Sequence, residues 1–470
     1  MSLYEFIQRA SQEFEQKMLE LGQNWDTEQL TGELAQQART ALVASFGHAS
    51  RTAYKAFLES YDLPDSQIEH QGQTLRYKLV SPKTFLTTFG IIALDRRLYQ
   101  ADAGGLSYVP LDHLWDMAGH FAVEEVRQAV CYAMAHMTAG ETAQLLRLGS
   151  LFQPSATAIQ HIVDKVSAEI EPQRETLDNT IRASVETPGE TKVLVASLDG
   201  ANVLLREPGP PRGRPQERPR GEPPEPKNAT YKNAMVGSIS FYGAVSEAPK
   251  GPERLRSLYT ARMPEVGAVT FKRDFERQLE RIEKSLDPPV RKVLLCDGQR
   301  VLWNYADHQE RFDSYEKLVD FYHTDEHLSH AAEALFGKKN AAAKRWYTKY
   351  HRVLLEQDDG VRAVRRSLAY YARTRRRGSA ERRQALAAER KFFRRNHHRM
   401  AYASFRRRGI PIGSGPVEAA CKSLVRTRLC RSGMRWSREG GQRILNFRCY
   451  AKSGLWKEFW EAYKQLRRSA

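Results

Sequence analysis

Two aspartates of this 470-residue chain each follow a run of apolar and β-branched residues and precede a glycine. Asp199 closes the run in KVLVASLDG (192–200), and Asp297 closes the run in KVLLCDG (292–298). One interpretation is local, because Asp-Gly between apolar runs is a strong signal for a hairpin turn. The other is chemical: two parallel strands lying side by side would bring both carboxylates to one place. A hairpin at Asp199 is compatible with the second interpretation, so the pattern leaves both open.

A third acid, Glu418, lies at the start of the helix predicted for VEAACKSLVRTRLC (417–430). Pro416 suits the first turn of that helix, where its missing N–H costs nothing. Glu418 then lies near the positive end of the helix macrodipole. By itself, such a glutamate is explained as a helix-stabilising residue that pairs with Lys422 one turn later. Together with two strand-end aspartates, it indicates a site of three carboxylates.

Three carboxylates in one place repel one another and raise each other's pKa unless cations neutralise them. Their hard oxygen atoms suit Mg²⁺ or Mn²⁺. Two such ions, about 3.5–4 Å apart, activate a water or hydroxyl and stabilise the leaving oxygen in phosphodiester displacement. We therefore expect Asp199, Asp297 and Glu418 to be catalytic and to hold two Mg²⁺ or Mn²⁺ ions.

The positive charge of the chain is concentrated in its last quarter. The whole chain has a net charge of +17, and residues 361–470 alone carry 30 Lys and Arg against 6 Glu and no Asp. Such a field attracts a polyanion, most simply nucleic acid; the alternative is a solvated, Arg-rich helical face. Trp346 could stack on an exposed base or lie in a core. The side chains predicted to contact DNA phosphates are Arg406, Arg407, Arg408, Lys422, Arg426, Arg428, Arg431 and Arg435.

Four stretches together resemble a known family. They are KVLVASLDG (192–200), VLLCDGQRVLWNY (293–305), KLVDFYHTDEHL (317–328) and IPIGSGPVEAACKSLVRTRLCRSGMRWS (410–437). In this order they resemble the successive blocks of bacterial DDE transposases, most closely the Kra-type insertion-sequence family of the Mutator-like group. The resemblance covers most of residues 75–455, and the last block is its most specific part.

The resemblance implies an α/β fold with an RNase H-like catalytic core, interrupted by a mostly helical insertion before Glu418. It implies that Asp199, Asp297 and Glu418 bind the metal ions, and that Asp320 and His323 form the D-x-x-H signature of such enzymes. The implied activity is DNA cleavage and strand transfer at the ends of an insertion sequence. Its partners would be terminal inverted repeats, target DNA and a second copy of the chain, in a homodimer or higher homo-oligomer.

Two other functions stay open at this point. The segment H-T-D-E-H contains His323, Glu326 and His327 in the H-x-x-E-H pattern of zinc hydrolases, with both histidines one helical turn apart. That interpretation leaves the charge distribution and the twin aspartates unexplained. The other alternative is a non-catalytic DNA-binding protein, such as a repressor descended from a transposase. The presence of all three acids argues against it.

The remaining elements divide the chain into six expected regions. Ser155 is the expected N-cap of the second helix of a helix-turn-helix candidate, with Thr157, Gln160 and His161 following it; an ordinary helical hairpin explains the same pattern. The first part of the core contains a Pro/Arg-rich loop, 208–227, whose composition cannot pack. The regions are helical (1–70), small β (71–111), helical and DNA-binding (112–185), first core part (186–337), basic helical insertion (338–408) and final core part with the C-terminal helix (409–470).

Five scattered cysteines without a CxxC pair predict a reduced, cytoplasmic protein with neither a disulfide framework nor a zinc ribbon. The chain lacks an apolar run of about 18 residues, so we expect no membrane partner.

Overall fold

The computed structural model describes residues 3–23, 30–102, 104–149, 152–183, 185–206, 229–245, 251–286, 289–374 and 379–469. The Pro/Arg-rich loop 208–227 therefore lies outside the described residues. The chain has a mixed α/β fold and divides into two compact units. One unit joins Met1–Asp178 to Lys457–Ala470, and the other contains Asn179–Trp456. Within the described ranges, no helix is long and apolar enough to cross a membrane.

The N-terminal unit begins with two helices that pack on each other, α1 (Leu3–Gln23) and α2 (Gly32–Glu59). An antiparallel sheet follows, in the order β1-β2-β3-β4. Its long strands are β2 (Gln73–Thr87) and β3 (Gly90–Ala101), and β1 (Gln67–His70) and β4 (Ser107–Tyr108) form the edges. The helices after the sheet are α3 (Pro110–Leu114), α4 (Glu124–His136), α5 (Ala139–Gly149), α6 (Ala156–Ile170) and α7 (Arg174–Ala183).

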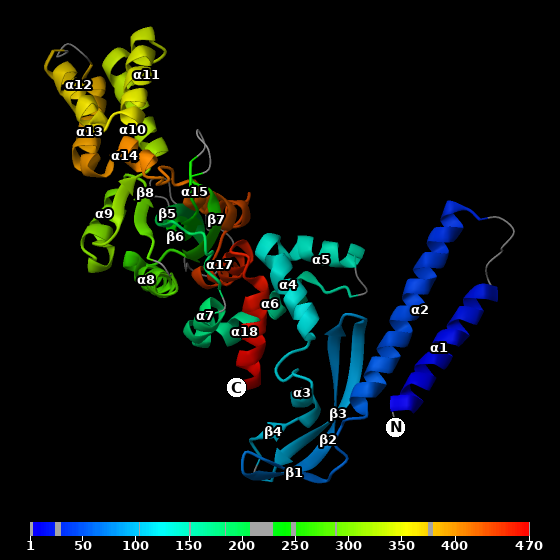
Figure 1. Cartoon of the computed structure of the whole chain (residues 1–470). Helices are drawn as coiled ribbons and strands as arrows, with labels where there is room; N and C mark the ends of the chain where they lie inside the picture. The colour runs from blue at the N-terminus through cyan, green and yellow to red at the C-terminus, as the bar shows by residue number, and fades with distance from the viewer. Residues whose placement is uncertain are drawn as a thin grey trace, which may run out of the picture. The chain divides into compact units, whose positions relative to one another are not determined.

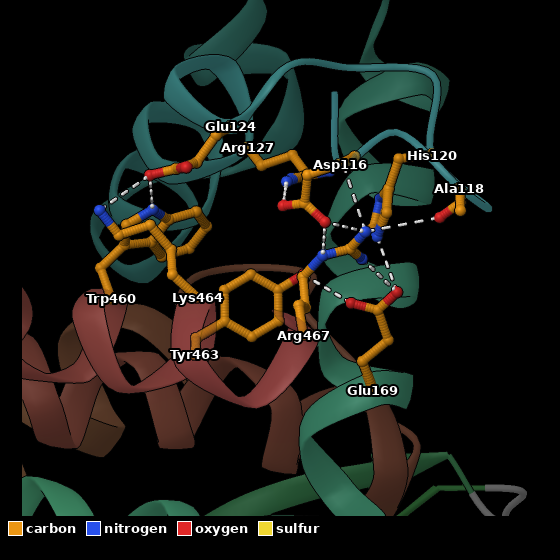
Figure 2. A network of polar contacts seen from close by, with 10 residues as sticks. All are labelled: Asp116, Ala118, His120, Glu124, Arg127, Glu169, Trp460, Tyr463, Lys464 and Arg467. Carbon is orange, nitrogen blue, oxygen red and sulfur yellow. Dashed lines mark hydrogen bonds and ion pairs between the residues drawn. The ribbon is translucent and has the colours of Figure 1, made fainter. Parts of the chain in front are cut away.

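The C-terminal helix α18 (Trp456–Ser469) belongs mostly to the N-terminal unit. Its apolar stripe is buried, since Phe459, Trp460 and Tyr463 are at most 1% exposed. Arg467 donates to Glu169 of α6 and to Asp116, as Figure 2 shows. From the sequence we expect this helix to belong to the final part of the core (409–470). The structure groups most of it with the N-terminal unit instead. Its apolar positions predict burial but do not identify the surface that covers them.

The second unit is built on a mixed five-stranded sheet with the order β7-β6-β5-β8-β9 (Figure 1). β5 pairs antiparallel with β6, and β6 with β7, whereas β5–β8 and β8–β9 are parallel. The predicted parallel neighbour of the first apolar run is thus present. The strands are β5 (Val193–Arg206), β6 (Ala229–Tyr242), β7 (Arg254–Arg262), β8 (Arg291–Cys296) and β9 (Glu316–Val319).

The hairpin interpretation of Asp199-Gly200, left open by the sequence, does not hold. Both residues lie inside β5, where they pair with Val236 and Met235 of β6. The two short strands expected on either side of them are one strand of 14 residues, because β6 pairs with β5 along its whole length. The sequence pattern does not predict β7, because its residues Arg254–Arg262 mix Arg and Ser with apolar side chains.

Helices connect the parallel strands and extend the unit. α8 (Val269–Lys284) packs on β6 and β7, and α9 (Arg300–Asp307) follows β8. Four helices then pack in a closed ring of neighbours, visible as a separate bundle in Figure 1. They are α10 (Phe321–Phe336), α11 (Ala341–Glu356), α12 (Gly360–Thr374) and α13 (Ala380–Asn396). α10 is a full member of this bundle, although we expected the insertion to begin at residue 338.

The chain returns to the sheet through α14 (Tyr402–Arg407) and a segment without regular structure. The helix predicted for residues 417–430 is present in three consecutive pieces. They are α15 (Gly415–Ala420), the π-helical η5 (Cys421–Arg426) and α16 (Thr427–Leu429). π-Helical turns are rare and occur frequently at functional sites. The helix α17 (Arg438–Lys452) then packs against β7.

Candidate active site

Asp199 lies in β5, and Asp297 directly follows the parallel neighbouring strand β8. The β5–β8 ladder runs from Val193 opposite Arg291 to Ala196 opposite Leu294. Each of its pairs differs by 98 positions, as do Asp199 and Asp297. Side chains of paired residues in a parallel ladder point to the same face. Continued by three residues beyond its last pair, this register directs both carboxylates to one face of the sheet. Both aspartates are half-buried.

The glycine that follows each aspartate provides room for another side chain. A Cβ on Gly200 would collide with the side-chain amide of Asn233 on the neighbouring strand. A Cβ on Gly298 would collide with the ring of Phe392 from α13 and would lie 3.3 Å from the imidazole of His323. Neither glycine has a positive φ. The repeated Asp-Gly therefore reflects close approach of other groups, not hairpin geometry.

The electrostatic environment of Asp297 connects it with both Asp199 and His323. Burial raises the pKa of Asp297, and the negative charge of Asp199 raises it further. A hydrogen bond from the backbone N–H of Gln299, 3.0 Å long, and the charge of His323 act in the opposite direction. A bound cation would offset the repulsion by which one carboxylate raises the pKa of its neighbour.

Glu418 approaches the same strands from a helix. α15 packs on β5 and β6, and η5 packs on β5. The Glu418 side chain is exposed, and its carboxylate accepts a hydrogen bond from the hydroxyl of Ser414 at 2.6 Å. Cys421, one turn later, is buried. Burial, the charge of Asp199 and a hydrogen bond with it raise the pKa of the Cys421 thiol, and the charge of Glu418 acts in the same direction. Cys421 thus lies within electrostatic reach of both acids.

Asp320 joins three segments of the site and is fully buried. Its carboxylate caps α10 by accepting from the N–H of His323 at 2.7 Å, and it also accepts from the N–H of Ser414. Its own N–H donates to the carbonyl of Cys296 at 2.8 Å. Asp320 therefore ties the start of α10 and the end of β8 to the segment that leads into the Glu418 helix. These hydrogen bonds of Asp320 are all with backbone groups, and its side chain is closed off from solvent.

The three acids offer the oxygen ligands that Mg²⁺ or Mn²⁺ prefers. Their ligand atoms are not, however, gathered as closely as a metal site requires. Within the described part of the chain, one group of His, Cys, Asp and Glu has all its ligand atoms within 4.8 Å of one another, namely His327, His330 and Glu389. The two-ion site therefore stays a prediction for Asp199, Asp297 and Glu418. Its chemistry fits, and it requires that cations draw the carboxylates together.

A basic groove of about 460 Å³ lies between α12 and α13. Among the described residues, no acid lines it. Arg362 forms an ion pair with Asp359 at 3.6 Å, but the other cations of the groove form no ion pair within the part of the chain that the structure describes. Unpaired cations in a groove are available for an anionic ligand. These side chains are Arg365, Arg366, Arg390, Lys391 and Arg394.

Several predicted DNA contacts are engaged elsewhere. Trp346 is 6% exposed and donates to Ser367, so its core interpretation is correct and it cannot stack on a base. Arg428 is 2% exposed, with its guanidinium over the ring of Trp436. Buried side chains of this kind do not reach DNA, so the predicted phosphate contact of Arg428 and the base-stacking interpretation of Trp346 are both wrong.

The other predicted cations are exposed. Arg407 and Arg408 already form ion pairs with Asp358 and Glu316. The Arg406 guanidinium donates to the carbonyl of Leu355 at 3.4 Å. The remaining exposed side chains are Lys422, Arg426, Arg431 and Arg435. Several cations of the predicted surface thus already have partners, whereas most cations of the groove between α12 and α13 have none among the described residues. The spacing of Arg in the sequence does not predict this groove.

The helix-turn-helix candidate consists of α5 and α6, which pack on each other and on α4. Ser155 caps α6 as predicted, since its hydroxyl accepts from the N–H of Ala158 at 3.1 Å. Thr157, Gln160 and His161 are exposed on the face of α6 opposite its buried residues. Their function as DNA contacts stays a prediction.

Comparison with known proteins adds little. No protein-family model matches the chain, and no curated protein is similar to it in sequence. Among solved structures, a chain of the Drosophila P element transposase strand transfer complex is similar over 71% of this chain and 79% of that chain, with 11% identity and a TM-score of 0.24. A TM-score this low supports no inference about fold or function, which must come from this chain's own residues.

Proposed function

We propose that this protein is a DDE transposase that cleaves DNA at the ends of an insertion sequence and transfers the strands to target DNA. The observation that carries the proposal is the register of the parallel strands β5 and β8, which brings Asp199 level with Asp297 when it is continued to them, with the Glu418 helix packed on β5. The sheet order, with β8 and β9 parallel to β5 and a helical bundle between β9 and Glu418, is the organisation expected of an interrupted RNase H-like core.

In this mechanism Asp199, Asp297 and Glu418 would hold two Mg²⁺ or Mn²⁺ ions. When bound, such ions activate the attacking oxygen and stabilise the leaving oxygen of the phosphodiester. The half-buried aspartates supply ligands on the rigid sheet, and Glu418 supplies one from the helix. The hydrogen bond from Ser414 orients the Glu418 carboxylate, and His323 balances the charge of Asp297.

The basic groove between α12 and α13 is the proposed path for DNA phosphates. Its five unpaired cations come from two helices. Binding of phosphates therefore breaks no existing ion pair of these side chains. Arg fork geometry matches phosphate oxygens, and contacts of this kind position DNA without reading its sequence.

A strand-cleavage assay tests the proposal. The substrate is supercoiled plasmid carrying the DNA that flanks the gene, incubated with or without Mg²⁺ or Mn²⁺. We expect nicking that depends on metal. Asp199→Asn, Asp297→Asn and Glu418→Gln should each reduce the rate by several orders of magnitude.

The triple variant separates catalysis from structure. Combining all three changes should cost little more than one, because residues that act as a unit are strongly non-additive. Each variant should bind DNA nearly as well as the parent. If the protein is a non-catalytic DNA-binding protein, binding will be sequence-specific while cleavage is absent from the parent. Cleavage by Glu418→Gln at the parental rate would refute the assignment.

A further inference from the structure

Three potential metal ligands that are not among the three acids of the proposed active site meet where α13 packs on α10. His327 and His330 are one turn apart on α10, and Glu389 comes from α13. One ligand atom from each residue lies within 4.8 Å of the other two. The sequence motif H-T-D-E-H pointed to His323 and Glu326 as the companions of His327. The fold instead provides His330 and Glu389, the latter 62 positions away from His327.

The burial of the three residues fits a site at the rim of the bundle. Glu389 is 8% exposed, His327 is half-buried and His330 is exposed. A buried carboxylate needs a cation or hydrogen-bond donors. Here the Nδ1 of His327 lies 2.6 Å from Glu389. His330 has no polar partner among the described residues, and its ring is nearly perpendicular to that of His327, with centroids 6.3 Å apart. His330 is thus exposed, and one of its ring nitrogens lies near the ligand atoms of His327 and Glu389.

The cluster borders the segment that carries Asp297. The ring of Phe392 stacks on His327 with centroids 3.6 Å apart, and the same ring closes over Gly298. His323 lies between the two places, 4.8 Å from His327 by ring centroids. Whatever fixes α13 to α10 therefore fixes the position of Phe392 beside the loop of Asp297.

We propose that His327, His330 and Glu389 form a zinc site that clamps α13 to α10. Two imidazoles and a carboxylate, with a fourth position for water, are ligands that suit Zn²⁺. Mg²⁺ does not suit them, because it prefers oxygen ligands. Ligands about 2.0–2.1 Å from a tetrahedral Zn²⁺ lie about 3.3 Å apart. The His327–Glu389 contact lengthens slightly on binding, and His330 closes toward them by a rotamer change at the surface.

The test uses the full-length protein freed of metal by dialysis against a chelator. Co²⁺ is titrated as a spectroscopic substitute, followed by visible d–d absorption, and Zn²⁺ is titrated by calorimetry in the presence of about 5 mM Mg²⁺. We expect one Co²⁺ or Zn²⁺ per chain at this site, an intense tetrahedral Co²⁺ spectrum and no competition from Mg²⁺. Excess Zn²⁺ should raise the melting temperature, since a ligand that binds only the folded state stabilises it.

His330→Ala is the decisive variant, because this exposed ring makes no polar contact with the described residues and its removal should leave the metal-free melting temperature unchanged. We expect it to weaken Co²⁺ and Zn²⁺ binding at least tenfold and to abolish the zinc-dependent rise in melting temperature. His308→Ala, an exposed histidine outside the cluster, is the matched control and should behave as the parent. Glu389→Gln provides a second measurement if it folds.

Parental metal binding by His330→Ala would overturn the proposal and show that the ion binds adventitiously to other histidines. A parent that binds neither Co²⁺ nor Zn²⁺ would also overturn it, leaving a hydrogen bond between His327 and Glu389 as the whole interaction. None of these measurements depends on DNA cleavage, so the zinc site and the transposase proposal can fail separately.

Discussion

The buried carboxylate of Asp320 accepts a hydrogen bond from the backbone N–H of Ser414, four residues before Glu418. The hydroxyl of Ser414 in turn donates to the Glu418 carboxylate. The start of α10 and the first turn of α15, distant in the sequence, are therefore connected through two residues. The family resemblance marked Asp320 as an accessory residue, and the structure supports a role in positioning the third acid.

Asp320→Asn should uncouple this connection. An asparagine keeps one oxygen that can cap α10, but its amide nitrogen cannot accept from Ser414, so one buried N–H is left without a partner. Leaving it unpaired costs about 1–3 kcal/mol, measurable as a lower urea midpoint. The cleavage rate should fall by more than the loss of stability explains, because Asp320 no longer fixes Ser414, which orients the Glu418 carboxylate.

Ser379→Ala is the control for a simple capping effect. Ser379 caps α13 at an exposed position, so its replacement should cost about 1 kcal/mol and leave cleavage unchanged. Equal cleavage rates for the two variants, measured well below their melting temperatures, would argue against the positioning role.

Gly298→Ala should displace Phe392, whose ring occupies the position of the new Cβ. Overpacking of this kind costs about 1–3 kcal/mol. Phe392→Leu in the same chain should recover part of that stability, since the smaller side chain makes room. A double-mutant cycle in urea measures the coupling. Gly140→Ala, where nothing lies within 4 Å of the new Cβ, should be neutral or slightly stabilising. Additive effects of the changes at 298 and 392 would show that the two groups do not meet.

The basic groove should dominate the salt dependence of DNA binding. Replacing Arg365, Arg366 and Arg390 with Ala should make the slope of log affinity against log salt shallower, by up to about 0.9 for each DNA phosphate that is no longer neutralised. Replacing Arg407 and Arg408 should change it less, because both are already paired with acids. Fluorescence anisotropy over a range of salt concentrations measures both slopes. A larger change for the Arg407 and Arg408 pair would place the phosphates on that surface instead.

Acid should destabilise the N-terminal unit through the contacts of Glu169 and His120 (Figure 2). Burial opposes the charge of Glu169, but hydrogen bonds from His120, Tyr463 and Arg467 prevail and lower its pKa from 4.5 to about 2. Burial lowers the pKa of His120 below 6.5, so at neutral pH its neutral imidazole donates to Glu169 at 2.7 Å.

Both shifts have the same consequence for stability. The unfolded chain takes up a proton at His120 as pH falls through 6.5, and at Glu169 as pH falls through 4.5 toward 2, before the folded chain does. We expect the free energy of unfolding to fall by about 2 kcal/mol between pH 7 and pH 3, after allowance for solvent screening of the partly exposed Glu169. Glu169→Gln should reduce this fall below pH 4.5, whereas Glu171→Gln, at an exposed position, should not. Urea midpoints at several pH values measure it.

The sequence by itself determined those features that depend on local pattern. The apolar runs before Asp199 and Asp297 predict two strands, and the structure pairs them in parallel. The Ser155 cap and the buried stripe of Phe459, Trp460 and Tyr463 follow from hydrogen-bonding and helical spacing alone. The excess of positive charge in residues 361–470 is likewise a property of composition.

Only the tertiary structure decided which residues meet. A periodic pattern states that a side chain is buried but not what covers it, so α18 could not be assigned to the N-terminal unit from its sequence. An Asp-Gly pair is equally compatible with a hairpin and with a strand whose glycine leaves room for Asn233. The H-T-D-E-H spacing suggested His323 and Glu326 as partners of His327, whereas the packing of α13 on α10 brings Glu389 to it from 62 positions away. Contacts of that separation depend on how helices pack, which local spacing does not encode.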